Sequence, residues 1–146
     1  MVPMPVRPAT PADAPTLARH RYPDEADAGE RDTYAAWVAG ALERGLYLGF
    51  LATGTEGRIV AGAGLTLLEW GPTRGDPQAW RGRIVNVWTD PDFRRRGLAR
   101  ELVTRCLEAA RECGVTRLGL GTTEAGRALY EALGFRVSGT EMVRRG

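Results

Sequence analysis

The chain has 146 residues, 43% of them apolar, and twenty basic against eighteen acidic residues leave a formal net charge of +2. This length suits one sizeable core but is short for two, so residues 1–146 are expected to form a single domain. No apolar run approaches the roughly 20 residues that span a bilayer, and residues 1–8 lack the apolar stretch of a secretory signal. We therefore expect a cytoplasmic protein with no membrane partner.

Composition also argues against several kinds of catalysis. All twenty basic residues are arginine, which removes the lysine of a Walker A loop and the Schiff-base lysine of pyridoxal phosphate enzymes. The single histidine, His20, and two cysteines cannot complete a zinc tetrad, so no metal is expected. The only serine, Ser138, lies outside any G-x-S-x-G motif. The favoured chemistry is one in which the enzyme supplies no nucleophile.

The N-terminal third of the chain is predicted to contain two helices. The Thr-Pro-Ala-Asp sequence at residues 10–13 supplies an N-cap, a first-turn proline and a first-turn acid, which predicts a helix over residues 11–20. Residues 22–30 contain a proline, a glycine and four acidic side chains and are predicted to form a loop. A helical apolar stripe then runs over residues 32–45, where a glycine ends it. Residues 5–7 are an optional first strand.

The middle of the chain changes to a strand pattern. Residues 46–52 and 58–68 are separated by a short Thr- and Gly-rich segment, which predicts a β-hairpin. Residues 70–82 are predicted to form a loop. Residues 84–89, Ile-Val-Asn-Val-Trp-Thr, form a nearly continuous apolar and β-branched run that is typical of a central strand.

The C-terminal part begins with the clearest helix of the sequence. Residues 98–113 carry apolar side chains at i, i+3, i+4 and i+7 with charged side chains opposite. A short strand is expected at residues 116–121, followed by a helix that Thr122 or Thr123 caps and that ends near residue 133. Two further strands are expected at residues 135–137 and 140–144.

Both cysteines fall on the apolar stripe of the long predicted helix. Cys106 and Cys113 lie seven residues apart, so the helix rise separates them by about 10 Å. That distance is too great for a disulfide. Both thiols are therefore expected to fill the core rather than to react.

The segment Asp90-Pro91-Asp92-Phe93-Arg94-Arg95-Arg96-Gly97-Leu98-Ala99 connects the predicted central strand to this helix. A strand that leads into a helix N-terminus presents unpaired backbone N–H groups and the positive end of the helix dipole, which together bind anions. Gly97 lets phosphate oxygens approach the backbone closely, and arginines bind phosphate through bidentate hydrogen bonds. For the arginines alone, a solvated basic turn is the alternative.

The spacing Arg94-x-x-Gly97-x-Ala99 resembles the Q/R-x-x-G-x-G/A signature of the GNAT acetyltransferase superfamily. Downstream, Gly-Arg-Ala-Leu-Tyr-Glu-Ala-Leu-Gly-Phe at residues 126–135 is similar to the family segment A-x-x-L-Y-E-x-L-G-F. The two motifs agree in order and separation, and the resemblance covers nearly the whole chain. It implies a mixed α/β (α+β) GNAT fold, with a central, mostly antiparallel sheet of six to seven strands, splayed at the fourth strand and flanked by about four helices.

The resemblance also implies a function. The family transfers the acetyl group of acetyl-CoA, here a cosubstrate, directly to a primary amine, so the expected acceptor is an amine of a small molecule or a protein N-terminus. The cofactor-binding residues that it implies are Val87, Trp88, Thr89, Arg94, Arg95, Arg96, Gly97, Leu98, Ala99 and Thr123. Thr123 stands where many relatives carry asparagine, which leaves its contact with the cofactor open.

Tyr130 is the expected catalytic residue. The pKa of a thiol is about 8.5 and that of a phenol about 10, so a tyrosine can protonate the departing thiolate with a small uphill difference. A packed aromatic ring is the alternative role. Backbone N–H groups near residues 87–89 are expected to stabilise the developing oxyanion.

No general base is assigned. Relatives often place a glutamate in or near the fourth strand, whereas Asn86 and Trp88 occupy the alternating positions here. The candidates Glu69, Asp24 and Glu25 are more typical of solvated surface carboxylates, and His20 is more typical of a dipole partner at a helix end.

Two other function classes stay open. A non-catalytic, regulatory CoA-binding module would keep the pyrophosphate loop without needing Tyr130. Nucleic-acid binding through the arginines at positions 94–96 and 100 would show a steep salt dependence, but the small basic excess does not indicate it. A homodimer is left open, since dimers are frequent in similar families. The acidic 24–30 loop and the 70–80 loop are candidate walls of the acceptor site.

Overall fold

The structure is a computed structural model that describes residues 4–146. The first three positions of segment 1–8, in which no secretory signal is expected, lie outside the described residues. The strands are β1 (Val6–Pro8), β2 (Tyr47–Thr53), β3 (Ile59–Glu69), β4 (Trp80–Thr89) and β5 (Leu118–Gly119), and the helices are α1 (Ala14–Arg21), α2 (Arg31–Glu43), α3 (Leu98–Glu112) and α4 (Glu124–Ala132). Short 3-10 turns at Pro11–Asp13, Glu25–Glu30, Thr55–Gly57 and Pro91–Phe93 connect them.

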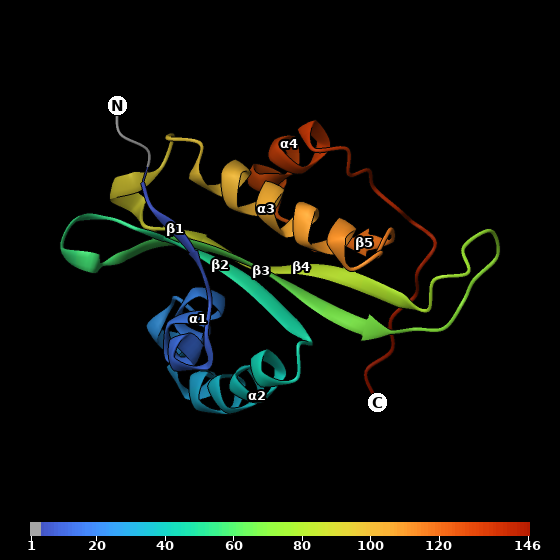
Figure 1. The fold of residues 1–146 in the computed structure, drawn as a ribbon, viewed down its shortest axis with the longest axis horizontal. Coiled ribbons are helices and arrows are strands. Elements are labelled where there is room, and N and C mark those ends of the chain that lie inside the picture. The colour runs from blue at the N-terminus through green and yellow to red at the C-terminus, as the bar shows by residue number, and fades with distance from the viewer. Residues whose placement is uncertain (1–3) are drawn as a thin grey trace.

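The strands form one sheet in the order β1-β2-β3-β4-β5. Helices α1 and α2 cover one face, and α3 and α4 cover the other (Figure 1). Strands β1 to β4 are antiparallel, and the expected hairpin is formed by β2 and β3. Strand β5 runs parallel to β4 but pairs with it only at Gly82 and Arg83. Beyond Arg83 the two strands separate, so the sheet opens beside the second half of β4.

The expected count of six to seven strands is wrong for the described residues, which form five. Residues 135–137 and 140–144 form no strand. A cavity of about 800 Å³ lies between them and the sheet, lined by Leu118 and Gly119 on one side and by Phe135, Arg136 and Ser138 on the other. Local alternation alone cannot make a strand without a hydrogen-bonding neighbour, and Met142 is accordingly 97% exposed.

Helix α3 buries the apolar face that its sequence predicts. Its buried side chains are Leu98, Leu102, Val103, Cys106 and Ala110, which pack in one core cluster with β2, β3 and β4. Burial raises the pKa of the Cys106 thiol to about 12, so this cysteine is a core residue as expected. The expectation for Cys113 is wrong, because α3 ends at Glu112 and Cys113 is exposed.

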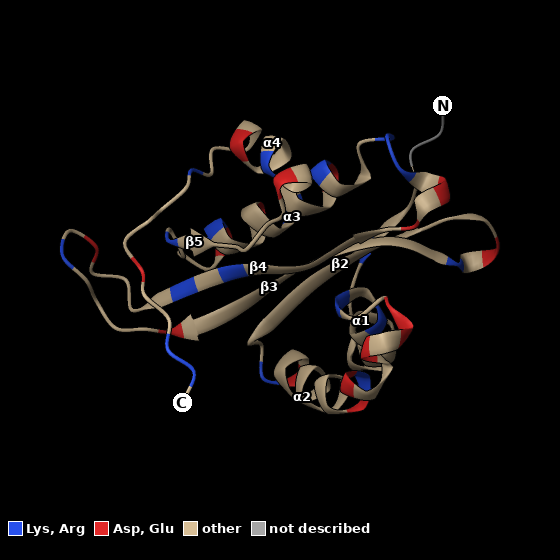
Figure 2. Cartoon of the chain, turned by 180° about the vertical axis from the view of Figure 1, so that it is seen from behind, with Lys and Arg blue, Asp and Glu red and all other residues tan. Residues whose placement is uncertain are grey.

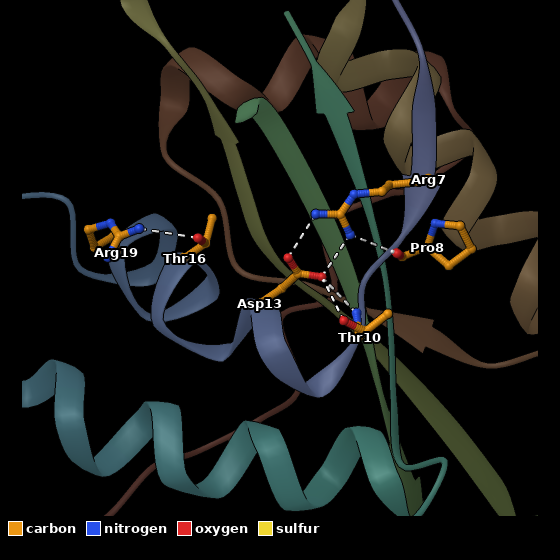
Figure 3. A network of polar contacts seen from close by, with 6 residues as sticks. All are labelled: Arg7, Pro8, Thr10, Asp13, Thr16 and Arg19. Atoms are coloured by element: carbon orange, nitrogen blue, oxygen red, sulfur yellow. Dashed lines mark hydrogen bonds and ion pairs between the residues drawn. The ribbon is translucent and has the colours of Figure 1, made fainter. Parts of the chain in front are cut away.

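A polar cluster at the chain's start joins β1 to α1 (Figure 3). The Arg7 guanidinium donates to both carboxylate oxygens of Asp13, at 2.8 Å each. Thr10 donates its backbone N–H to the same carboxylate at 2.8 Å, which completes a capping arrangement before α1. The hydrogen bond from Arg7 holds the pKa of Asp13 below its usual value. The first strand and first helix are thereby fixed to each other.

Within residues 4–146, no helix has both the length and the apolar character that crossing a membrane requires.

Candidate functional site

A pocket of about 530 Å³ lies where β4 ends and α3 begins. Its walls come from the end of β4, the loop before α3, the first turn of α3 and the start of α4. The sequence-predicted residues on these walls are Val87, Trp88, Thr89, Arg94, Arg95, Gly97, Leu98, Ala99, Thr123 and Tyr130. The pocket therefore brings together all of the predicted site residues except Arg96.

Arg96 is not among the residues that line this pocket. Its guanidinium lies 4.8 Å from the centre of the Phe93 ring and donates to the backbone oxygen of Asp92 at 3.4 Å. The side chain thus packs on the 3-10 turn at Pro91–Phe93. A role for Arg96 in holding phosphate stays a prediction.

The loop before α3 has an unusual backbone. Arg95 and Gly97 both adopt the left-handed conformation, with φ of 65° and 75°. Left-handed residues in such a loop turn successive backbone N–H groups toward one side, which makes an anion-binding nest. A side chain at a left-handed position is strained by about 1 kcal/mol or more, so Arg95 stores strain of the kind found at functional sites.

The N-terminus of α3 continues this donor surface. The first bond of the helix runs from Glu101 N to Gly97 O at 3.0 Å, so the three preceding N–H groups have no intrahelical partner. No side chain caps this end of the helix within the described residues. A Cβ added to Gly97 would meet nothing within 4 Å, so the space above the loop is open to a ligand. This end of the helix therefore fits an anionic group such as a pyrophosphate.

Asp90 fixes the entry into the loop. One of its carboxylate oxygens accepts from Asp92 N at 2.9 Å, and the other pairs with Arg58 at 2.6 Å. Because Arg58 offsets the negative charge, Asp90 can shape the turn with less repulsion toward an anion in the pocket. Figure 2 shows basic residues at the loop leading into α3, and acidic and basic residues side by side around α1 and α2.

The second half of β4 offers a free backbone edge. Strand β5 leaves β4 after Arg83, and residues 87–89 of β4 line the pocket. On its other edge β4 is paired with β3, with Trp88 opposite Gly62 and Val85 opposite Gly64. Two residues of β4, Asn86 and Val87, therefore lie opposite the single residue Ala63, which is a β-bulge. The bulge comes directly before the free edge.

Tyr130 lies between two cavities. It lines the pocket described above and a neighbouring cavity of about 440 Å³, and Thr122 also lines both. The ring is partly buried and meets Phe135 edge to face at 6.1 Å. Burial raises the pKa of Tyr130, so its hydroxyl keeps its proton at neutral pH and can act as a proton donor.

The start of α4 explains one departure from the family motif. A Cβ on Gly126 would lie 2.6 Å from the Thr122 hydroxyl oxygen, so glycine makes room for the Thr122 side chain here. Thr123 is the N-cap residue of α4, as predicted, but its side chain makes no capping hydrogen bond. Sequence reasoning did not place Thr122 in the site. The signal that it missed is the pairing of two threonines with a glycine four residues after the first.

The other lining residues that sequence reasoning did not assign to the site are Phe93, Arg100, Gly121, Gly126 and Leu129. Three of these, Phe93, Arg100 and Leu129, are direct chain neighbours of predicted site residues. Widening each motif by one residue would have found them.

None of the general-base candidates lines the pocket. Asp24, Glu25 and Glu69 are exposed. His20 lies in the last turn of α1, near the helix end as expected, but is buried, with its ring stacked on Trp88 at 4.4 Å. Burial, with a smaller contribution from the charge of Arg19, lowers the pKa of His20 to about 4. His20 is therefore neutral at pH 7 and a poor acceptor for the proton of an ammonium group.

Comparison with solved structures identifies the fold. The crystal structure of a GCN5-related N-acetyltransferase from Ralstonia eutropha JMP134 matches with a TM-score of 0.87 and 32% identity, over 98% of each chain. A predicted acetyltransferase from Clostridium acetobutylicum, crystallised with acetyl-CoA, matches with a TM-score of 0.88 at 22% identity, over 98% of this chain and 96% of that one.

Sequence comparison finds two curated relatives. Glucosamine 6-phosphate N-acetyltransferase of Trypanosoma brucei brucei is 35% identical over 86 residues, which are 59% of this chain and 56% of the relative. [Ribosomal protein bS18]-alanine N-acetyltransferase of Salmonella typhimurium is 42% identical over 55 residues, which are 36% of this chain and 37% of the relative. The chain thus spans only about half the length, or less, of these relatives.

One protein family matches most of the chain. Residues 13–135 match the acetyltransferase (GNAT) family, a range that includes β4, the loop before α3 and Tyr130. Together with the fold, this match shows that the chain belongs to the GNAT acetyltransferase family.

Proposed function

We propose that this chain, acting as a single domain over residues 1–146, is an N-acetyltransferase. It transfers the acetyl group of acetyl-CoA directly to a primary amine of a small molecule or of a protein N-terminus. The observation that carries the proposal is that one pocket joins an uncapped helix N-terminus, a free strand edge and a tyrosine. The names of both curated relatives describe N-acetylation.

The loop and the first turn of α3 would hold the pyrophosphate of acetyl-CoA. The left-handed backbone at Arg95 and Gly97 and the free N–H groups of the helix supply hydrogen-bond donors. Arg94, Arg95 and Arg100 line the same pocket and add charge-assisted bonds to phosphate oxygens. Thr122 and Thr123 also line the pocket.

Acetyl-CoA supplies an acyl thioester, whose carbonyl carbon is attacked by the amine and whose thiolate leaves. We expect backbone N–H groups on the free edge of β4, within residues 87–89, to stabilise the negative charge that develops on the carbonyl oxygen. Tyr130 donates the proton that the leaving thiolate needs. From ordinary pKa values this transfer is uphill by about 1.5 units, or about 2 kcal/mol, and burial of Tyr130 adds to the difference.

The amine must lose a proton before it attacks. An aliphatic ammonium with a pKa of about 10.4 is neutral in only about one molecule in two thousand at pH 7. Among the described residues, no carboxylate lines the pocket, and His20 is too weak a base. We therefore assign proton removal to water, and expect the fraction of free amine to set the rate.

Replacing Tyr130 by phenylalanine separates the enzyme from a regulatory CoA-binding module. The proposal predicts that Tyr130→Phe lowers the rate of free-thiol release with an active amine by about 100-fold, while its affinity for acetyl-CoA stays within about twofold, or about 0.4 kcal/mol. Tyr22→Phe is the matched control, because Tyr22 lies on the opposite face of the sheet, at the end of α1. A wild-type protein that binds acetyl-CoA but releases no thiol across a broad amine panel would favour the regulatory module.

A further inference from the structure

Asn86 lies at the β4 bulge and is 91% buried, since only 9% of its surface is exposed. Its amide nitrogen donates to the hydroxyl of Tyr34 at 2.7 Å and to the hydroxyl of Tyr47 at 3.0 Å. Its amide oxygen accepts from the Arg21 guanidinium in a longer bond of 3.4 Å. Both amide hydrogens and the carbonyl oxygen of this buried side chain are thus satisfied.

The chemistry of the partners fixes how the amide is turned. A guanidinium has only donors, so the amide oxygen must face Arg21 and the NH₂ group must face the two tyrosines. Burial raises the pKa of both Tyr34 and Tyr47, which keeps the two hydroxyls neutral. The Arg21 guanidinium also lies 4.7 Å from the centre of the Tyr34 ring, which holds that ring beside the amide.

The backbone of Asn86 also adopts an unusual conformation. Its φ of 56° places it in the left-handed region, where asparagine is tolerated better than other side-chain-bearing residues. A left-handed residue at a bulge turns the strand and re-aims the residues that follow it. Here those residues are 87–89, the free edge of β4 that lines the pocket.

Strand β3 leaves room for this arrangement. A Cβ on Gly64 would overlap the hydroxyl of Tyr47, and a Cβ on Gly62 would lie 2.8 Å from Nδ1 of His20. The two glycines of β3 on either side of Ala63 therefore leave space for the Tyr47 hydroxyl and the His20 ring. The partners of Asn86 come from α1, α2 and β2, so the network joins the face covered by α1 and α2 (Figure 1) to the strand that borders the pocket.

We propose that Asn86 is a positioning residue: its left-handed backbone and its bonds to Arg21, Tyr34 and Tyr47 set the direction of the β4 N–H groups that polarise the thioester carbonyl. This inference rests on the proposed function. Asn86 does not touch acetyl-CoA; it acts through the backbone of residues 87–89. Its loss should weaken contacts with the acetyl group and leave contacts with the pyrophosphate unchanged.

Three variants separate the parts of this role. Asn86→Gly keeps the left-handed backbone and removes the amide, whereas Asn86→Ala removes the amide and also disfavours the backbone conformation. Tyr34→Phe removes one hydroxyl of the network without changing β4. Tyr22→Phe is the matched control. The Tyr22 ring meets Tyr34 edge to face at 6.3 Å, but the hydroxyls to which Asn86 donates are those of Tyr34 and Tyr47. Thermal unfolding of each variant verifies that it is folded.

The readout is the infrared stretching frequency of acetyl-CoA labelled with ¹³C at the thioester carbonyl, measured free and bound. Hydrogen bonding to the carbonyl lowers this frequency on binding to the wild-type protein. We expect the lowering to shrink in Tyr34→Phe, further in Asn86→Gly and most in Asn86→Ala. By calorimetry, Asn86→Ala should bind acetyl-CoA about fivefold more weakly, the size of one lost hydrogen bond, with unchanged affinity for CoA.

The outcomes distinguish a failure of the Asn86 role from a failure of the proposed acetyltransferase function. If the folded Asn86 variants lower the carbonyl frequency as much as the wild type does, the role of Asn86 is overturned and the proposed function stands. If CoA affinity falls as much as acetyl-CoA affinity, Asn86 merely maintains the fold, and the positioning role is again overturned. A wild-type protein that binds neither ligand would overturn the proposed function and this role with it.

Discussion

Lowering the pH from 7 to 5 should destabilise the protein through His20. This residue is 7% exposed, and its buried Nδ1 has no hydrogen-bond partner among residues 4–146. Burial lowers its pKa to about 4 in the folded state, against about 6.5 in the unfolded chain. The unfolded chain therefore takes up a proton first, so this contribution is fully present above pH 6.5 and is lost as pH falls toward 4.

The magnitude follows from the two pKa values. Between pH 7 and pH 5 the free energy of unfolding should fall by about 2 kcal/mol, and by pH 4 the loss should approach about 3 kcal/mol. His20 is the only histidine in the chain. Most carboxyl groups titrate below pH 5, so the change in unfolding free energy between pH 5 and pH 7 should come mainly from His20.

Urea denaturation at pH 7, 6 and 5 measures this effect. His20→Phe is the comparison variant, because it keeps an aromatic ring against Trp88 and cannot titrate. We expect the wild type to lose stability across the window and the variant to stay nearly level. The proton NMR signal of the single imidazole gives the pKa directly. Equal pH slopes for the two proteins, or an imidazole that titrates near pH 6.5, would refute the reasoning.

Three further predictions test the core, the N-terminal cluster and the chemistry. Leu102→Ala should lower the free energy of unfolding by about 3 kcal/mol, because Leu102 is fully buried. As the control, Glu108→Ala at an exposed position of the same helix should change it by less than about 0.5 kcal/mol. Equal effects of the two substitutions would contradict the packing. Asp13→Asn should lower the free energy of unfolding by about 1 to 2 kcal/mol, because it weakens the bonds from Arg7. The difference from the wild type should vanish at pH values low enough to protonate Asp13, whose pKa is lowered. A difference that does not change with pH would refute this prediction. With an active alkylamine, kcat/KM should rise about tenfold per pH unit from pH 6 to 8, and a pH-independent rate would point to a base within the protein.

The candidate site was largely predictable because its parts are close in sequence. A central strand, the loop of residues 90–97 and a strongly amphipathic helix follow one another, and their geometry alone brings residues 87–89 beside the α3 N-terminus. The glycine at position 97 and the arginines around it carry local signals. Tyr130 came from a second motif, and the fold brings it to the same pocket.

What the sequence did not predict depends on distant partners. Asn86 looks like one more residue of an apolar strand, and its bonds reach residues 39 to 65 positions away. The direction of Arg96 depends on stacking against Phe93, which charge and spacing do not encode. The predicted strands over residues 135–144 failed because alternation is a local property, whereas a strand requires a neighbour.

Calorimetric titration with acetyl-CoA tests the central claim most directly, namely that the loop before α3 holds this cosubstrate. The comparison variant is Gly97→Ala, whose added Cβ meets no protein atom within 4 Å but strains the left-handed backbone, φ 75°, that shapes the proposed anion site. We predict binding by the wild-type protein and binding at least about tenfold weaker, or about 1.4 kcal/mol, by folded Gly97→Ala. A wild-type protein that shows no binding at millimolar acetyl-CoA, or a variant that binds equally well, would contradict the claim.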